Sequence, residues 1–228
     1  MFACLHPGTI RTVVLSCQKE LATETPTPRR TRSDGERSRR TILQAAASLA
    51  TVDGLGGISI GNLAAHIGMS KSGLYAHFGS KEELQLATID TANDIFVAEV
   101  VAPTESIADP LERLLALCER FIDHLERRVF PGGCFFASVE AEFDTHPGAV
   151  KDKIGEVQRG WENMILELVA EAQRAGELRA GEDPKQLAFE LNAFLAMGNA
   201  GFVMSDDADY LRRARVAVGL RVELSRAR

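Results

Sequence analysis

Apolar residues recur at every third or fourth position over most of the chain, which is the spacing of amphipathic helices and not of strands. The predicted helices cover approximately residues 33–52, 59–66, 71–78, 80–101, 109–130, 134–145, 147–175, 183–204 and a last segment from residue 207 or 209. Helix start signals support three of these boundaries, namely Asp109-Pro110, Asp183-Pro184, and Ser80 with Glu83 three residues later. The pattern therefore predicts an all-α fold of about nine helices, without a strand or an internal repeat.

Residues 58–84 predict two short helices joined by a tight turn, with the start of a further helix behind them. Ala64 permits the two helices to approach closely, and Gly68 permits the chain reversal between them. The predicted buried face of this unit consists of Leu63, Ile67, Leu74 and Phe78. The polar residues of the second helix stay available for a partner, which is typical of a DNA-reading helix-turn-helix in a homeodomain-like three-helix domain.

The charge distribution agrees with DNA binding at one end of the chain. Residues 29–82 hold eight basic and four acidic residues and carry a net charge of +4, whereas residues 83–228 hold 16 basic and 26 acidic residues and carry −10. A basic front on an acidic body confines the attraction for DNA to one region. We expect residues 1–32 to form a disordered N-terminal extension, residues 33–80 the DNA-binding domain, and residues 81–228 a helical ligand-binding and dimerisation domain.

Residues 37–85 resemble the DNA-binding domain of the tetracycline-repressor (TetR) family of bacterial regulators. The resemblance rests on Ile58-Ser59-Ile60, on Ala64 with Gly68, on Gly73-x-Tyr75-x-x-Phe78, and on Lys81 with Leu84. It implies DNA contacts from the exposed polar positions of this motif, which are Ser59, Ser70, Lys71, Ser72, Gly73, Tyr75, His77 and Lys81. Lys71 and Ser72 are best placed to reach base edges. Tyr75 and His77 resemble the family's phosphate-contacting positions, although Tyr75 could instead be a half-buried scaffold residue.

The C-terminal segment carries many large aromatic residues, and these can line a cavity between helices as well as fill a core. By resemblance, a ligand would lie among the helices of this segment, and the candidate lining is Phe96, Phe121, Phe135, Val139, Trp161 and Ile165. Few charged residues are expected to point inward, so we predict an apolar or amphipathic small-molecule ligand. The last two helices are unusually apolar, which indicates burial against a second subunit. The predicted homodimer contacts are Leu187, Leu191, Phe194, Leu195, Gly198, Phe202, Val218 and Val222.

Catalytic and metal-binding motifs are weak or missing. The stretch from Gly54 to Ser59 lacks the third glycine of a dinucleotide fingerprint, and Cys118 and Cys134 have no metal-ligand spacing. No apolar run in the sequence approaches the roughly 18 residues of a membrane helix. We therefore predict no enzyme activity, no cofactor, no metal and no membrane, in a reduced cytoplasmic setting.

The predicted function is that of a ligand-responsive homodimeric transcriptional regulator, a repressor released from a partly palindromic operator. The alternative is a small-molecule carrier or enzyme with a vestigial DNA-binding domain.

Overall fold

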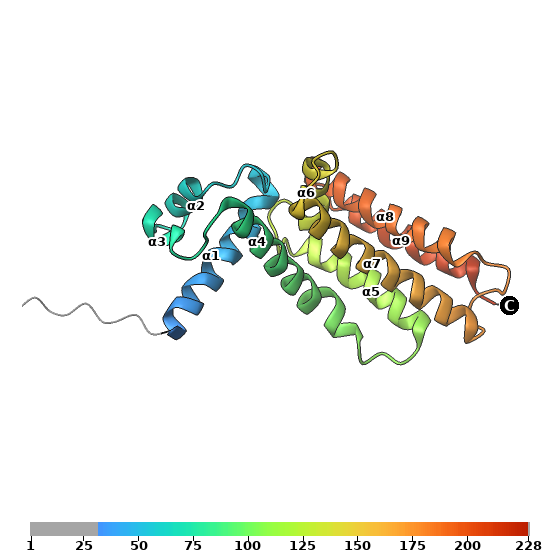
Figure 1. Cartoon of the computed structure of the whole chain (residues 1–228). Helices are drawn as coiled ribbons and strands as arrows, with labels where there is room; N and C mark the ends of the chain where they lie inside the picture. Colours follow the sequence, from blue (N-terminus) through green and yellow to red (C-terminus); the bar gives the residue numbers. More distant parts are fainter. Residues whose placement is uncertain (1–31, 228) are drawn as a thin grey trace, which may run out of the picture.

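The computed structural model describes residues 32–227, and all its regular elements in that range are helical apart from one isolated bridge between Leu178 and Arg226. Its nine α-helices within these residues confirm the all-α prediction (Figure 1). They are α1 (Arg32–Asp53), α2 (Ile60–His66), α3 (Lys71–Tyr75), α4 (Lys81–Phe96), α5 (Pro110–Glu126), α6 (Phe135–Phe143), α7 (Ala149–Arg174), α8 (Pro184–Ser205) and α9 (Asp209–Ser225). The predicted N-terminal extension, residues 1–32, lies outside the described residues except for Arg32, with which α1 begins.

The start signals found in the sequence act as helix caps. The Asp109 carboxylate accepts a hydrogen bond from the Glu112 amide at 2.7 Å, one turn into α5, and Asp183 caps α8 in the same way. Ser80 caps α4 by accepting from the amide of Glu83 at 3.0 Å. These bonds satisfy amides that have no partner inside the helix, which fixes where each helix begins.

Helix α3 is shorter than predicted, because it ends at Tyr75 and not at Phe78. The amide of His77 bonds the carbonyl of Leu74, three residues back, at 2.9 Å, so the chain tightens and leaves the α-helical path. This turn directs Phe78 into the core, where it is 1% exposed. The side chain of Arg39 from α1 lies over its ring, 4.4 Å from the centroid, and so fastens α3 to α1.

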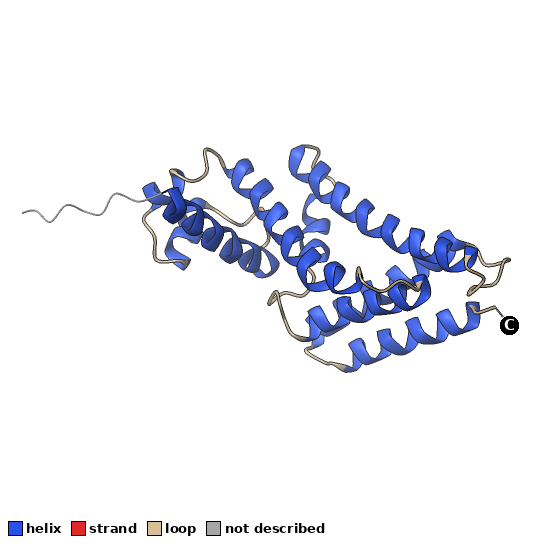
Figure 2. Ribbon diagram, turned by 90° about the horizontal axis from the view of Figure 1, so that it is seen from below, coloured by secondary structure: helices blue, strands red, loops and turns tan. Residues whose placement is uncertain are grey.

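The C-terminal part is a bundle in which α5, α7, α8 and α9 pack along one another, while α4 leads from the N-terminal domain into it (Figures 1 and 2). The helical path of α4 reaches Val101 as predicted, but its last turn, Val97–Val101, is π-helical. Helix α6 lies across the junction and contacts both α1 and α7. Both α4 and α6 therefore connect the two parts of the molecule.

Helix α8 is apolar on nearly every side, so the sequence pattern did not show which side of it faces the core. Its 22 residues reach a mean hydropathy of 1.3 over 18 positions, so by length and composition alone it is apolar enough to cross a membrane. Part of this apolar surface is core, since α8 packs against α5, α7 and α9.

The dimer contacts expected on α8 and α9 require correction, because most of them belong to this core. Seven of the eight are buried within the subunit and Phe194 is half-buried; the seven are Leu187, Leu191, Leu195, Gly198, Phe202, Val218 and Val222.

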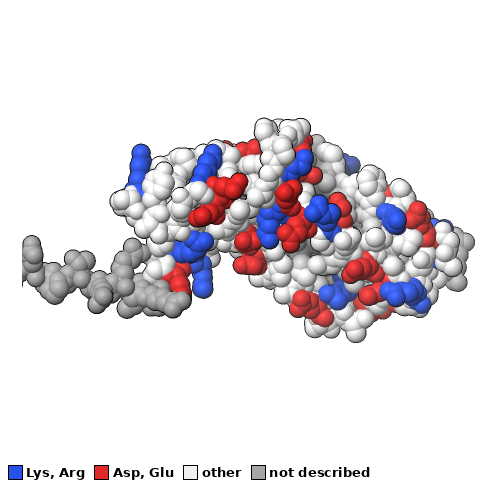
Figure 3. All heavy atoms as spheres, in the orientation of Figure 1, with Lys and Arg blue, Asp and Glu red and all other residues white. Residues whose placement is uncertain are grey.

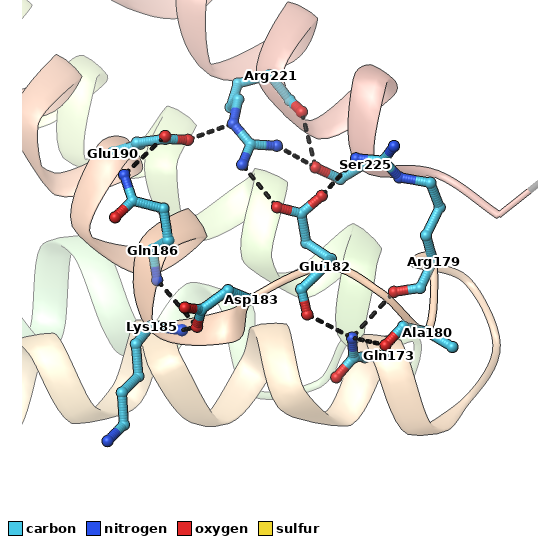
Figure 4. A network of polar contacts seen from close by, with 10 residues as sticks. All are labelled: Gln173, Arg179, Ala180, Glu182, Asp183, Lys185, Gln186, Glu190, Arg221 and Ser225. Carbon is cyan, nitrogen blue, oxygen red and sulfur yellow. Dashed lines mark hydrogen bonds and ion pairs between the residues drawn. The ribbon is translucent and has the colours of Figure 1, made fainter.

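A polar network closes the far end of the bundle and ties the α7–α8 turn to α9 (Figure 4). The Arg221 guanidinium pairs with Glu182 at 2.7 Å and also contacts Glu190 and the Ser225 hydroxyl. The hydrogen bond from Arg221 lowers the pKa of Glu182 from 4.5 to about 2. Gln173 donates to three carbonyls of the same turn, so this end of the molecule is fixed by side chains and not by apolar packing alone.

Candidate DNA interface and ligand cavity

The turn between α2 and α3 has the geometry that the sequence predicted. Gly68 adopts a φ of +67°, in the left-handed region that favours glycine, and the amide of Met69 bonds back to the carbonyl of Ala64 at 2.9 Å. Ala64 is buried in the contact between the two helices. The two helices lie at one end of the molecule, where α3 faces away from the bundle (Figure 1).

The outer surface of α3 carries exposed polar side chains. Lys71 and Ser72 are exposed at its first positions, and Tyr75 is 59% exposed at its last. This exposure resolves the open question about Tyr75, which is a surface residue and not a half-buried scaffold residue. The Lys71 ammonium lies over Gly61 of α2, where an added Cβ would come within 3.4 Å of it. Lys71 thus stays close to α2 in the structure, and its flexible side chain needs to extend to reach a base edge.

The two serines of the predicted DNA surface act first as caps. Ser59 caps α2 in a reciprocal capping box with Asn62, accepting from its amide at 3.1 Å. Ser70 caps α3 by accepting from the amide of Gly73 at 3.1 Å. A Cβ on Gly73 would lie 3.0 Å from the Ser70 hydroxyl oxygen, so this glycine leaves room for the cap. Both serines are exposed, but their hydroxyls already contribute to the structure.

His77 and Lys81 connect the DNA-binding unit to its neighbours. His77 is half-buried, and its carbonyl accepts from the Arg39 guanidinium at 2.7 Å. Lys81 is exposed at the first turn of α4 and donates to the carbonyl of Gly56 at 2.5 Å. In Figure 3, basic and acidic side chains are both visible at the N-terminal end, and both are interspersed over the bundle.

A cavity of about 190 Å³ lies in the bundle between α4, α5, α6, α7 and α8. Four aromatic residues contribute to its wall, and the remainder is a mixture of aliphatic, small and polar residues. The lining residues are Phe96, Phe121, Cys134, Phe136, Ala137, Glu140, Val157, Gln158, Trp161, Glu162, Asn192, Leu195, Ala196 and Asn199.

Three of the six ligand residues expected from the sequence line this cavity, and three do not. Phe96, Phe121 and Trp161 are in the wall. Phe135, Val139 and Ile165 are instead fully buried in the core and require correction. On α6, the ring in the wall is Phe136, the immediate neighbour of Phe135, because consecutive helical residues point about 100° apart. The wall also includes Glu140 and Glu162, which are both exposed.

The α1–α2 loop is held by side chains from both connecting helices. The Glu142 carboxylate of α6 accepts from the amides of Leu55 at 2.8 Å and Gly56 at 2.6 Å. Gln85 of α4 donates to the carbonyl of Leu55 at 3.1 Å. The sequence analysis missed Glu142 and Gln85, because nothing in a local pattern indicates a contact across 30 residues, as for Gln85, or across 86 and 87 residues, as for Glu142. Two of the five helices that line the cavity, α4 and α6, therefore also hold the loop that precedes the helix-turn-helix.

Two ionisable groups near the cavity have strongly shifted pKa values. His124 of α5 lies between the rings of Phe96 and Phe130, with centroid distances of 5.8 and 5.7 Å. Burial lowers the pKa of His124 to about 4, and neither ring nitrogen has a hydrogen-bond partner among the described residues. Burial raises the pKa of the Cys134 thiol, which keeps it protonated. Within residues 32–227, no group of three or more potential ligands could hold a metal ion.

The fold and its surfaces define a helix-turn-helix DNA-binding protein with a sensory helical bundle. Residues 42–88 match the family described as bacterial regulatory proteins, tetR family, and residues 110–218 match the tetracyclin repressor-like C-terminal domain. The chain belongs to the TetR family of transcriptional regulators, with a DNA-binding and a ligand-binding domain.

Individual relatives agree with this assignment. The chain is 26% identical over 157 residues to the transcriptional regulator AcuR of Cereibacter sphaeroides, covering 68% of this chain and 71% of AcuR. A TetR regulator structure from Chloroflexus aurantiacus matches with a TM-score of 0.79 and 25% identity, covering 85% of this chain and 98% of that one. A structure of AibR in complex with isovaleryl coenzyme A and operator DNA matches with a TM-score of 0.65 and 26% identity, covering 80% and 96%.

Proposed function

We propose that this regulator is a repressor that binds a partly palindromic operator as a homodimer and is released by a small molecule bound in the bundle. It would act in the cytoplasm, where the DNA lies. The observation that carries the proposal is the exposed outer face of α3, with Lys71, Ser72 and Tyr75 free of the core. The AibR relative, solved with operator DNA, supports the assignment of this face to DNA.

We assign the roles of the interface residues from the exposure and the contacts of each side chain. Lys71 and Ser72 read base edges in the major groove, where lysine can donate to guanine acceptors. Tyr75 and Lys81 contact phosphates and fix the register of α3. Ser59, Ser70, Gly73 and His77 support this surface, the serines through caps that they already form and His77 through its bond with α1. Sequence choice then rests on the first residues of α3.

The homodimer is supported by an exposed apolar face on α8 and α9, on the opposite side from the residues buried in the core. This face consists of Phe189, Met197, Met204, Val216, Leu220 and Leu224, which are between 48% and 87% exposed. On α8 the alanines 193, 196 and 200 continue the same exposed stripe at helical spacing. A second copy that covers this face with the same face forms a four-helix interface with two-fold symmetry. The two α3 helices then address half-sites about one DNA turn, or a multiple of it, apart.

The dimer is tested by a charge placed on this face. Leu220→Glu sets two carboxylates near the two-fold axis, so we expect sedimentation to report the mass of one subunit in place of two. Ala141→Glu adds the same side chain at an exposed position of α6 and should leave the mass unchanged. A dimer that survives Leu220→Glu at micromolar concentration contradicts this interface.

The connection between ligand and DNA runs through α4 and α6. Phe96, near the end of α4, and Phe136 of α6 both line the cavity. The same helices hold the α1–α2 loop through Lys81 and Glu142. A ligand that prefers a different arrangement of these walls therefore changes the separation of the two α3 helices and lowers operator affinity.

The regulator proposal is tested by binding to DNA from upstream of the protein's own gene, with scrambled DNA of the same composition at one fixed salt concentration. We expect specific binding that falls at least tenfold in Lys71→Ala and in Tyr75→Ala. The matched control is Lys185→Ala, which removes an exposed lysine at the far end of the bundle and should retain full affinity. Ligand binding without any preference for the upstream DNA would favour the carrier alternative. Full operator affinity in both α3 variants would refute this reading surface.

A further inference from the structure

The cavity wall has a one-sided charge. Glu140 of α6 and Glu162 of α7 bring two carboxylates to it, and no lysine, arginine or histidine belongs to the wall that the described residues form. Two basic side chains, Lys151 and Arg159, line a neighbouring hollow that shares Glu140 and Gln158 with the cavity. An anionic ligand in this cavity would therefore meet two negative charges and no compensating positive one.

The two carboxylates are not used by the fold. Several acidic residues of the bundle surface have ion-pair partners, as Glu182 and Glu190 do with Arg221. Glu140 and Glu162 are exposed, and neither forms an ion pair or a hydrogen bond among residues 32–227. They therefore remain available to a ligand at the mouth of the cavity.

Three neutral polar side chains of the wall, Trp161, Asn192 and Asn199, already form hydrogen bonds, whereas Gln158 forms none among the described residues. The Trp161 indole N–H donates to the Asn192 side-chain oxygen at 2.7 Å, and the Asn192 amide donates to the carbonyl of Ala188 at 3.1 Å. The Asn199 oxygen accepts from the amide of Cys134 at 2.9 Å. Trp161 consequently offers a ligand its ring and not its hydrogen-bond donor.

The rings gather around Trp161. The Phe96 ring meets it edge-on with a centroid distance of 5.3 Å, and the Phe121 ring stacks on it at 5.7 Å. Phe136 closes the group through an edge contact with Phe96 at 6.4 Å. Aromatic faces attract cations, tryptophan most strongly, and they pack equally well against apolar groups.

We propose that the ligand of this cavity is an organic cation, an ammonium group on an apolar body, held by the rings around Trp161 and by Glu140 and Glu162. This inference rests on the proposed ligand-binding role of the bundle and narrows the apolar or amphipathic ligand expected from the sequence to a cationic amphipathic one. The net charge of −10 over residues 83–228 attracts such a cation at long range, and salt weakens that attraction. Phosphorylated and carboxylated small molecules are disfavoured by the same charges.

Trp161 is the only tryptophan of the chain, so its fluorescence reports directly on the cavity. The probes are phenyltrimethylammonium, its uncharged isostere tert-butylbenzene, and benzoate, each titrated into the full-length protein without DNA. We expect the cation to change the Trp161 emission with about tenfold higher affinity than tert-butylbenzene, from the combined cation–π and carboxylate contributions. Benzoate should not bind measurably, and added salt should weaken the binding of the cation alone.

Substitutions separate charge from shape. In the double variant Glu140→Gln and Glu162→Gln, we expect the cation to lose about tenfold in affinity while tert-butylbenzene is unaffected. Glu167→Gln, an exposed carboxylate of α7 outside the cavity wall, is the matched control and should bind like the unmodified protein. Both positions of the double variant are exposed, so the fold does not depend on them.

Three results overturn the inference. They are equal affinities for the cation and tert-butylbenzene, tighter binding of benzoate, and no response of Trp161 to any probe. Operator binding is measured separately and without these compounds. Its failure would refute the regulator proposal, whereas the titrations decide the charge of the ligand on their own.

Discussion

Acidification should destabilise this protein through His124 before its carboxylates begin to titrate. His124 is 1% exposed, lies among aromatic rings, and neither ring nitrogen is hydrogen-bonded among the described residues. The neutral ring is tolerated there, but a charged imidazolium would lose its hydration without gaining a partner. Burial therefore lowers its pKa from 6.5 to about 4, although Glu99 nearby partly opposes this shift and Arg127 adds to it.

The magnitude follows from this difference in pKa. When the folded state binds its proton less readily than the unfolded state, stability is complete above the unfolded pKa and falls as the pH decreases toward the folded pKa. The full difference between the folded and unfolded pKa of His124 corresponds to about 3.4 kcal/mol of unfolding free energy, at about 1.36 kcal/mol per pKa unit. Between about pH 7.5 and pH 5.5 the loss is about 1.3 kcal/mol, with the remainder lost mostly down to about pH 4.

The assay is urea unfolding at fixed protein concentration, followed by circular dichroism, across this pH range. The comparison is His124→Leu, which fills the site with an apolar side chain that does not titrate. We expect the free energy of unfolding of the unmodified protein to fall by about 1.3 kcal/mol more than that of the variant between about pH 7.5 and pH 5.5. Parallel pH dependences for the two proteins would refute the reasoning, because His124 would then titrate alike in the folded and unfolded states.

Three further predictions concern other contacts. Glu142→Gln replaces a charged acceptor of two loop amides by a neutral one, so it should cost about 1–2 kcal/mol and speed hydrogen exchange of those amides; unchanged exchange would contradict the grip on the loop. Gly132→Ala should strongly destabilise the protein in thermal unfolding, because its Cβ would lie 1.9 Å from the Thr51 carbonyl oxygen. Gly160→Ala has open space around it on α7 and should instead stabilise the protein by about 0.5–1 kcal/mol. Arg221→Met should remove a stabilisation that is present above about pH 4.5 and lost from there toward pH 2, so it should lower the melting temperature at neutral pH and have little effect at about pH 2.

The fold could be predicted from the sequence because the signals that start and end its helices involve only residues close together in the chain. Asp109 and Asp183 mark helix starts through caps that involve only the next few residues, and the structure confirms both. The turn at Gly68 is equally local, since its left-handed φ of +67° is a property of one residue. Features that depend on a few neighbouring residues can therefore be predicted from the sequence without any knowledge of the tertiary structure.

The site could be predicted only in part because its remaining features depend on which neighbour each helix meets. Helix α8 is apolar on nearly every side, so the pattern could not distinguish Leu191, which is in the core, from Phe189, which is 68% exposed. On α6 the choice between Phe135 and Phe136 depended on the rotation of the helix relative to α7. Glu142 was invisible for a related reason, because its partners lie 86 and 87 residues away.

The two proposed connections from cavity to DNA are sufficient in energy for a regulatory switch. A tenfold loss of operator affinity requires about 1.4 kcal/mol of difference between the two states of the protein. One charge-assisted hydrogen bond is worth about 1.5–3 kcal/mol, and Glu142 makes two of them to the α1–α2 loop. A ligand that displaces α6 enough to lengthen either bond therefore supplies the required difference, even if the contact of Lys81 with Gly56 stays intact.

By reciprocity, operator DNA lowers the affinity for the ligand by the same factor, so ligand affinity measured with and without DNA gives the coupling directly. Glu142→Gln should reduce that factor while leaving ligand affinity without DNA unchanged, and an undiminished factor would assign the coupling to α4 alone.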